Sequence, residues 1–276
     1  MRIGVLIAMF GLLASGATRP ARADDASGGE RPVPARVSPA AAGALSLVPG
    51  LGQMITGRPL EGAAWLAAVV AGLSSRSTFF GQASFDLWQY NVYDAYRGAG
   101  ARDVPDHGPL ADYAAAFNPL NLWDPVSAGA VGVAFASHPF QRRYGELGYP
   151  SISKWLVPPF YAFVGMGEEG LFRGYLHPVL SDAFESLPLE RFWARVAGAT
   201  VSSAAFAAFH LVNGRALDGD FLVFGGRFLS GLAFCWQAER NDHDLRKNVF
   251  AHAWYDIILD YNARADKGVG LSITFR

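Results

Sequence analysis

The chain has 276 residues, enough for one large domain or two small ones, and its formal net charge at pH 7 is −1. A nucleic-acid partner would require a basic surface, so this charge argues against one. Hydrophobic residues make up 51% of the chain and charged residues only 17%, against about 25% in an average soluble protein, which favours a membrane setting. The single cysteine, Cys235, excludes an internal disulfide and a multi-cysteine metal site, and we expect it to be a packing residue.

The N-terminus has the pattern of a secretory signal. Arg2 provides a positive charge, residues 3–15 are an uncharged and mostly apolar stretch, and residues 21–23 (ARA) fit a small-x-small cleavage site. We therefore predict a signal peptide over residues 1–23, with an uncleaved membrane anchor as the alternative. Residues 24–38 are rich in proline, glycine and charge, which predicts a disordered linker.

Residues 39–122 are predicted to form an N-terminal helical region. Two stretches without charge, 37–57 and 62–75, flank a short polar turn, and the glycines of VPGLGQMITG favour a helical hairpin. An amphipathic helix near 82–97 and a loop follow. The many Trp and Tyr residues of this helix are typical either of a membrane interface or of an ordinary surface helix.

The C-terminal half repeats apolar stretches, which are 125–141, 155–167, 196–214, 228–238 and 248–259. Crossing a bilayer takes about 20 apolar residues in one helix, so several of these stretches are marginal alone. The fold class that we predict is all-α, a polytopic transmembrane bundle of about 6–7 apolar helices with a polar cavity in its C-terminal half. A soluble all-helical core is the alternative.

Residues 123–262 are predicted to be the core of this bundle, and residues 263–276 a peripheral tail. The last ten residues, 267–276, alternate loosely in the manner of a strand, but the rest of the chain lacks the alternating segments of a barrel. We expect a multi-pass protein in the membrane of a bacterial cell envelope, with the inner membrane favoured.

Residues 167–177, GEEGLFRGYLH, place charges directly after an uncharged stretch. On a helix, Glu169 and Arg173 are four residues apart and can pair, whereas Glu168 lies about 100° from Glu169 and about 140° from Arg173. We interpret the pair as an internal salt bridge and Glu168 as a carboxylate that is free to react. Ionisable residues in apolar segments usually face a bundle interior or a water-filled cavity. The alternative is that the helix leaves the membrane at Gly167 and that these charges are interfacial.

Two further apolar segments carry polar groups. In SAAFAAFHLVNG, Phe206 and His210 are four residues apart on one helical face, and in NVFAHAWYDIIL the same spacing separates His252 from Asp256. A single such histidine is usually a satisfied core residue. Three segments of this kind in a chain with 6 histidines favour one shared site. His177 is a weaker candidate for the same cavity.

The motifs EEGLFRG, FAAFH and HAWYD match the patterns EExxxR, FxxxH and HxxxN/D in this order. Over residues 150–262 the chain resembles the CPBP family of intramembrane proteases, which includes the type II CAAX prenyl endopeptidases. The resemblance implies peptide-bond hydrolysis, with a peptide or protein substrate at the membrane and the lipid bilayer as partners. It does not extend to the N-terminal 150 residues.

The resemblance also implies roles for individual residues. By this resemblance Glu168 would be the general base that activates water, and His210 would position that water. His252 and Asp256 would occupy the places that stabilise the oxyanion in family members. Structural support comes from three neighbours, Glu169, Arg173 and Phe206. A carboxyl group in a cavity of low dielectric has a raised pKa, which suits a base that acts near neutral pH.

Asp256 is a departure from the family, because many relatives have asparagine at this position. An ionised aspartate cannot donate a hydrogen bond and would repel an oxyanion. Asp256 is therefore protonated, or orients His252, or binds a metal. Glu168, His210, His252 and Asp256 are Zn²⁺ ligands by type, but no HExxH helix is present and we favour a mechanism without an obligatory metal.

Two other functions fit the same sequence. One is a catalytically silent membrane protein of this fold that acts by binding, in immunity or in maturation of a partner. The other is an envelope scaffold in which the polar residues are structural salt bridges. The family name suggests a prenylated substrate, whereas the predicted signal sequence suggests that the name describes ancestry only.

Overall fold

The computed structural model describes residues 37–101, 104–105, 107–137, 150–213 and 221–266. Within these ranges all regular structure is helical, which confirms the all-α prediction. The predicted signal peptide, most of the linker and the tail strand lie outside the described residues. The helical elements are α2 (Pro39–Leu45), α3 (Leu51–Ile55), α4 (Pro59–Leu73), α5 (Thr78–Gly98), α6 (Pro109–Ala115), η1 (Pro119–Trp123), α7 (Pro125–Ala136), η2 (Lys154–Leu156), α9 (Val157–Glu169), η3 (Gly170–Leu176), α10 (His177–Glu185), α11 (Arg191–Asn213), α12 (Phe221–Arg240) and α13 (Arg246–Asp266).

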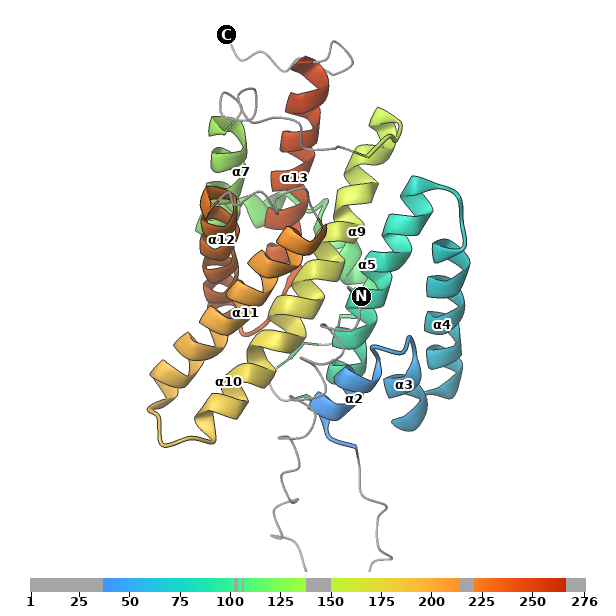
Figure 1. Cartoon of the computed structure of the whole chain (residues 1–276), viewed down its shortest axis with the longest axis vertical. Helices are drawn as coiled ribbons and strands as arrows, with labels where there is room; N and C mark the ends of the chain where they lie inside the picture. The colour runs from blue at the N-terminus through green and yellow to red at the C-terminus, as the bar shows by residue number, and fades with distance from the viewer. Residues whose placement is uncertain (1–36, 102–103, 106, 138–149, 214–220, 267–276) are drawn as a thin grey trace, which may run out of the picture.

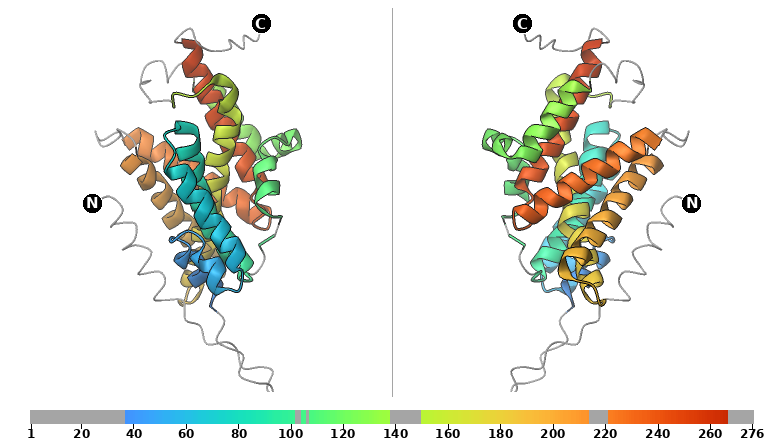
Figure 2. Two further views of the ribbon diagram at one scale, coloured as in Figure 1. Left: turned by 90° about the vertical axis from the view of Figure 1, so that its right-hand side faces the viewer. Right: turned by 90° about the vertical axis from the view of Figure 1, so that its left-hand side faces the viewer.

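A continuous rod formed by α9, η3 and α10 runs through the middle of the bundle (Figure 1). Helices α5 and α13 pack against α9, and α11 packs against α10. Glycines let the helices approach closely. A side chain at Gly165 would lie 3.0 Å from the carbonyl oxygen of Val249 in α13, and one at Gly167 would lie 2.5 Å from the carbonyl oxygen of Asp86 in α5. The two side views of Figure 2 show α4 and α5 on one side of the bundle and α11 and α12 on the other.

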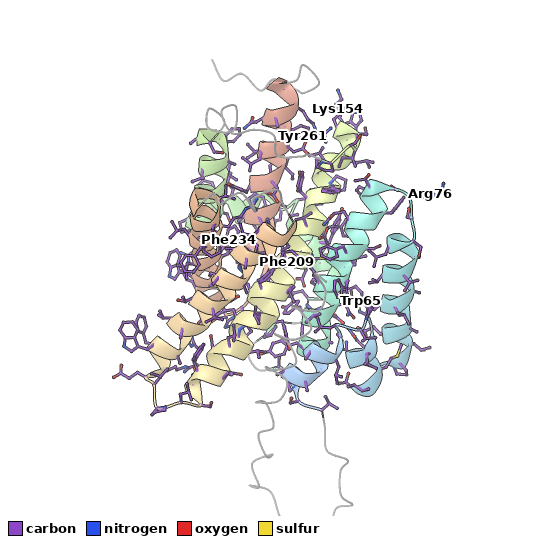
Figure 3. All side chains as sticks on the ribbon, in the orientation of Figure 1. Trp65, Arg76, Lys154, Phe209, Phe234 and Tyr261 are labelled. Carbon is purple, nitrogen blue, oxygen red and sulfur yellow. The ribbon has the colours of Figure 1, made fainter. Side chains whose placement is uncertain are left out.

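Helix α5 differs from the predicted amphipathic helix. It extends from Thr78 to Gly98, and its second half is buried on nearly all sides, with polar residues such as Asn91 and Asp94 inside. The reason is that α2, α3 and α4 cover the face that the sequence assigned to solvent or to a membrane interface. Trp65 of α4 lies against α5 in Figure 3 and is largely buried.

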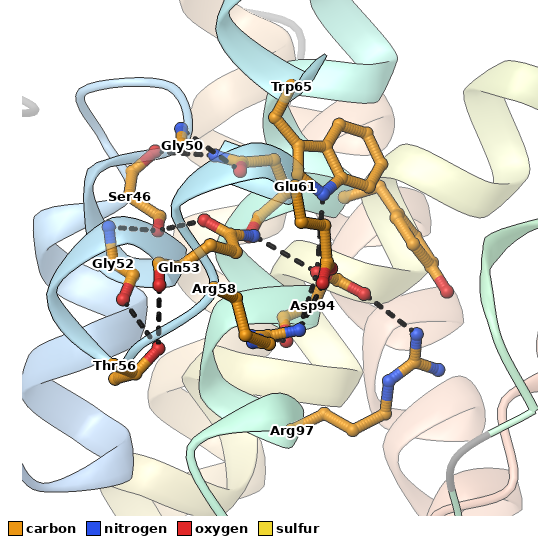
Figure 4. Close-up of polar contacts among 12 residues, drawn as sticks. Ser46, Gly50, Gly52, Gln53, Thr56, Arg58, Glu61, Trp65, Asp94 and Arg97 are labelled. Carbon is orange, nitrogen blue, oxygen red and sulfur yellow. Dashed lines mark hydrogen bonds and ion pairs between the residues drawn. The ribbon is translucent and has the colours of Figure 1, made fainter. Parts of the chain in front are cut away.

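The glycine-rich hairpin owes its shape to one close contact. Gly50 has a φ of 79°, and a side chain there would lie 1.9 Å from the carbonyl oxygen of Gly62. Only glycine combines this φ with this approach without strain. Gln53 then reaches α5, where its amide donates to Asp94 Oδ2 at 3.0 Å (Figure 4). The hairpin is thus fixed to α5 by buried polar contacts.

The described helices do not include one that is long and apolar enough to cross a membrane by itself. The transmembrane part of the fold prediction therefore stays a prediction. Large apolar side chains are nevertheless exposed on several helices, among them Leu60 at 88% and Trp123 at 87%.

Candidate active site

Glu168 and Glu169 end α9, directly before the π-helical segment η3. The sequence predicts an ordinary α-helix here, and the structure instead has seven residues of π-helix from Gly170 to Leu176. Short π-helical segments occur frequently at functional sites because they redirect side chains on one face of a helix. Both glutamates are buried, with 7% of Glu168 and none of Glu169 exposed.

Glu169 and Arg173 form the pair that their spacing predicts. Arg173 Nη1 donates to Glu169 Oε1 at 3.1 Å, and neither side chain is exposed. The guanidinium also lies over the ring of Phe206 at 4.2 Å and over that of Phe234 at 5.3 Å. Aromatic faces stabilise a buried cation, so the charge of Arg173 is balanced by one carboxylate and by these rings.

His210 of α11 faces Glu168. The Nδ1 atom lies 2.8 Å from the carbonyl oxygen of Phe206, and because a carbonyl oxygen only accepts, Nδ1 carries the proton. Burial lowers the pKa of His210 to about 3, and the positive charge of Arg227 adds to this effect. The ring is therefore neutral, and its unprotonated Nε2 lies 3.4 Å from Glu168 Oε2.

His252 of α13 contacts three carboxylates. Its Nδ1 lies 2.6 Å from Glu169 Oε1, and its Nε2 lies 3.6 Å from Glu168 Oε2 and 3.5 Å from Asp256 Oδ2. Burial alone would lower the pKa of His252, but hydrogen bonds to Asp256 and Glu169 raise it to about 10. His252 is therefore an imidazolium at neutral pH. The ring of Phe234 stacks on it at 5.8 Å.

The electrostatics distinguish Glu168 from Asp256. Burial raises the pKa of Glu168 to about 7, an effect that Asp256 reinforces and that His252 opposes. For Asp256, burial also raises the pKa, but the hydrogen bond to His252 and the positive charges of His252 and Arg227 lower it below the ordinary value. Glu168 thus exchanges a proton near neutral pH, while Asp256 stays ionised.

The structure brings the four predicted residues together from three helices. Glu168 comes from α9, His210 from α11, and His252 and Asp256 from α13. Phe209 and Phe234, whose rings flank the histidines, mark this place in the middle of the bundle in Figure 3. An apolar hollow of about 420 Å³ lies elsewhere, between α4 and α5, and none of the four residues lines it.

Other candidates lie apart from this site. His177 is buried beside Glu239, 3.6 Å from its Oε1, and its ring faces that of His243. Ser202 is buried and donates to the carbonyl oxygen of Phe172. Cys235 is fully buried, as expected of a packing residue.

Two residues of the site were not recognised in the sequence. Asn248, one turn before His252 on α13, donates to the carbonyl oxygen of Phe234 at 2.8 Å and to Glu169 Oε2 at 3.4 Å. Asp86 of α5 is fully buried behind Gly167. The only sequence signal for Asp86 is a charge within an aromatic helix, and the charged groups that act on it, Glu168, His252 and Asp256, are distant in sequence.

Glu168, His210, His252 and Asp256 are Zn²⁺ ligands by type, which raises the question of a bound metal ion. No group of three or more His, Cys, Asp or Glu side chains in the described ranges is arranged to hold one. His252 Nδ1 lies against Glu169 and its Nε2 against the carboxylates of Glu168 and Asp256, so in this arrangement both nitrogens carry protons and a metal would have to displace the one on Nε2. We therefore derive no step through zinc.

Residues 150–258 match the family model described as Type II CAAX prenyl endopeptidase Rce1-like. This match confirms the resemblance seen in the motifs and places this segment in the CPBP family of CAAX proteases. It contains α9, η3, α10, α11, α12 and most of α13, and thus all four predicted site residues. No curated protein and no solved structure gave a significant match. The family to which this segment is similar consists of proteases.

Proposed function

We propose that the protein is a glutamate-dependent endopeptidase that hydrolyses a peptide bond with water activated by Glu168 and His210. One observation carries the proposal. Glu168 Oε2 lies 3.4 Å from the unprotonated Nε2 of His210, so two hydrogen-bond acceptors face one another. A water molecule donates one hydrogen to each of two such acceptors, which holds its oxygen in a fixed position.

Proton transfer follows from the charges. The water oxygen attacks the peptide carbonyl carbon while Glu168 accepts a proton from the water. A base with a pKa of about 7 is half ionised at neutral pH, which suits both acceptance of this proton and its return. Glu168 then delivers the proton to the leaving nitrogen, the C–N bond breaks, and the carboxyl product forms.

Stabilisation of the tetrahedral oxyanion is assigned to His252. Its Nε2–H faces the same region as Glu168, and the ring is positively charged. A placed donor at a developing oxyanion typically contributes about 10²–10³ in rate. Asp256 is ionised, so of its three possible roles we propose that it orients His252 and maintains its charge.

We place this site at a membrane, since the family is membrane-embedded in general. Exposed apolar side chains support membrane association. The side chain of Trp155, in η2 directly before α9, is 73% exposed, and that of Leu229 in α12 is 64% exposed. Burying such residues against lipid removes the cost of exposing them to water. Fractionation of the expressed full chain into membrane and soluble pools tests this placement.

The catalytic proposal is tested by cleavage of a peptide library with the detergent-purified full chain, beside Glu168→Gln and in the presence and absence of a chelator. We expect cleavage by the wild-type protein in both conditions and none by the variant. Loss of wild-type cleavage with chelator would move the mechanism to a metal. A folded wild-type protein that binds peptides but cleaves none would support the binding function instead.

A further inference from the structure

Asp86 of α5 is a buried carboxyl group that the four-residue mechanism does not use. It lies outside the segment matched by the family model, and none of it is exposed. The backbone of α5 at Asp86 touches α9 at Gly167, where a built Cβ would lie 2.7 Å from the Cα of Asp86. The residue after Gly167 is Glu168, so α5 closes the site on this side.

The hydrogen bonds of Asp86 define its two oxygens. Oδ1 accepts from the amide of Gln82 at 3.0 Å and from the amide of Gln89 at 3.3 Å. Oδ2 is buried and has no hydrogen-bond partner among the described residues. An oxygen that accepts two N–H groups behaves as a carbonyl oxygen, so a proton on this carboxyl group lies on Oδ2.

No Lys or Arg of the described chain pairs with Asp86. The charged groups that face it are Glu168 on α9 and His252 and Asp256 on α13, and its neighbours on α5 are neutral amides. Glu168, by contrast, has two imidazoles within 3.6 Å. Two carboxyl groups that share a dry region do not both ionise, and the one with the better partners takes the charge.

We propose that Asp86 is a positioning residue for Glu168, a neutral carboxylic acid whose Oδ2–H donates a hydrogen bond to the Glu168 carboxylate, directly or through one water. This inference rests on the proposed function in that it makes Glu168 the base. The hydrogen bond holds the carboxylate against rotation and favours its ionised form. Burial and the negative charge of Glu168 also raise the pKa of Asp86 well above its ordinary value.

The proton on Asp86 can be observed without any activity. Infrared spectroscopy of the full chain at roughly pH 9, about two units above the pKa of Glu168, separates the C=O stretch of a carboxylic acid from ionised carboxylates. We expect a carboxylic-acid band in the wild-type protein and in Glu168→Gln, and its absence in Asp86→Asn. Absence of the band from the wild-type protein would overturn the proposal, whatever reaction the protein catalyses.

The positioning role is tested by the pH dependence of peptide hydrolysis in Asp86→Asn and Asp86→Leu. Asparagine keeps an acceptor and a donor in place, so the acidic limb of kcat/KM stays within about 0.3 pH units of wild type and kcat falls about threefold. Leucine removes the donor, so the acidic limb moves up by about one pH unit and kcat falls about 30-fold, with KM little changed.

The opposite shift would contradict the proposal. If Asp86 were ionised, both variants would remove a negative charge beside Glu168, and the acidic limb would move to lower pH. A purely structural Asp86 predicts no shift in either variant and therefore also overturns the positioning role. Because the leucine variant removes acceptors for two buried amides, a thermal melt accompanies it, and the asparagine variant and the infrared band decide the question if leucine unfolds the protein.

Discussion

Two buried carboxylates of this protein, Asp94 and Glu168, lie in clusters with opposite properties. Asp94 accepts hydrogen bonds from Gln53 and Trp65 and pairs with Arg97 at 3.0 Å (Figure 4). Burial alone raises the pKa of Asp94, but hydrogen bonds to Gln53 and Glu61 and the charge of Arg97 lower it below the ordinary value. Glu168 has no cation in hydrogen-bond contact, and its pKa is raised to about 7.

The difference separates a structural cluster from a reactive one. The carboxylate of Asp94 accepts hydrogen bonds from Gln53 of α3 and Trp65 of α4, so it is ionised at neutral pH and fixes both helices to α5. Glu168 Oε2 is buried without a hydrogen-bond partner among the described residues. Such an atom costs free energy and persists where function requires it. Burial of a carboxylate alone therefore does not identify a catalytic residue. A buried carboxylate oxygen that lacks a hydrogen-bond donor, such as Glu168 Oε2 in the described part of the chain, is a better indication of one.

The largest expected effect comes from making the same change in both clusters. Glu168→Gln removes the base, and we expect kcat to fall about 10³-fold while the protein stays folded. Asp94→Asn removes a charge far from the reaction, so kcat per folded molecule stays close to wild type. Peptide hydrolysis measured beside circular dichroism checks both. A large loss of kcat in folded Asp94→Asn would contradict the distinction between a structural cluster at Asp94 and a reactive one at Glu168.

Stability should respond in the reverse order. Arg97→Met leaves Asp94 and Asp112 buried without their arginine, and we expect a loss of about 3 kcal/mol in the free energy of unfolding. Arg76→Met is the matched control, since Arg76 is exposed, and should change stability by less than about 0.5 kcal/mol. Denaturant titration of both variants measures the difference in the free energy of unfolding. Equal losses of stability would contradict the structural role of the Asp94–Arg97 cluster.

Glu168 itself should lower stability at neutral and alkaline pH. Its folded pKa of about 7 lies above the ordinary value of 4.5, so the folded state loses stability as pH rises from the lower value through the higher one. Glu168→Gln removes this penalty. We expect the variant to be more stable than wild type by about 2 kcal/mol above pH 7.5 and equally stable near pH 4. Melting curves across this range would refute the raised pKa if the difference were constant.

The smallest effect concerns Asp256. Asp256→Asn removes a hydrogen-bonding carboxylate that raises the pKa of His252. The pKa of His252 should fall, so the alkaline limb of kcat should move to lower pH by about one unit, with about a tenfold lower rate at high pH. A pH–rate profile checks this. An unmoved alkaline limb would show that Asp256 does not maintain the charge of His252.

Local spacing accounts for the parts of the site that sequence predicts well. Glu169 and Arg173, and likewise His252 and Asp256, are close because residues four apart share a helical face. Asp86 could not be found this way. Its contact with Gly167 joins positions 81 residues apart (86 to 167). The need for glycine at position 167 arises only from the packing of α5 against α9, where any side chain would overlap Asp86. The π-helix at Gly170–Leu176 likewise has no local sequence signature.

Helix periodicity and motif spacing are local properties, so they are enough to predict the helical class, the family motifs and the four polar residues. Tertiary structure alone decided which of these groups are charged. His210 and His252 are both histidines in apolar helices, but burial and the positive charge of Arg227 on α12 lower the pKa of His210, which is neutral, whereas hydrogen bonds to Asp256 and to Glu169 on α9 raise the pKa of His252, which is cationic. Protonation depends on partners brought from other helices, and no local pattern encodes them.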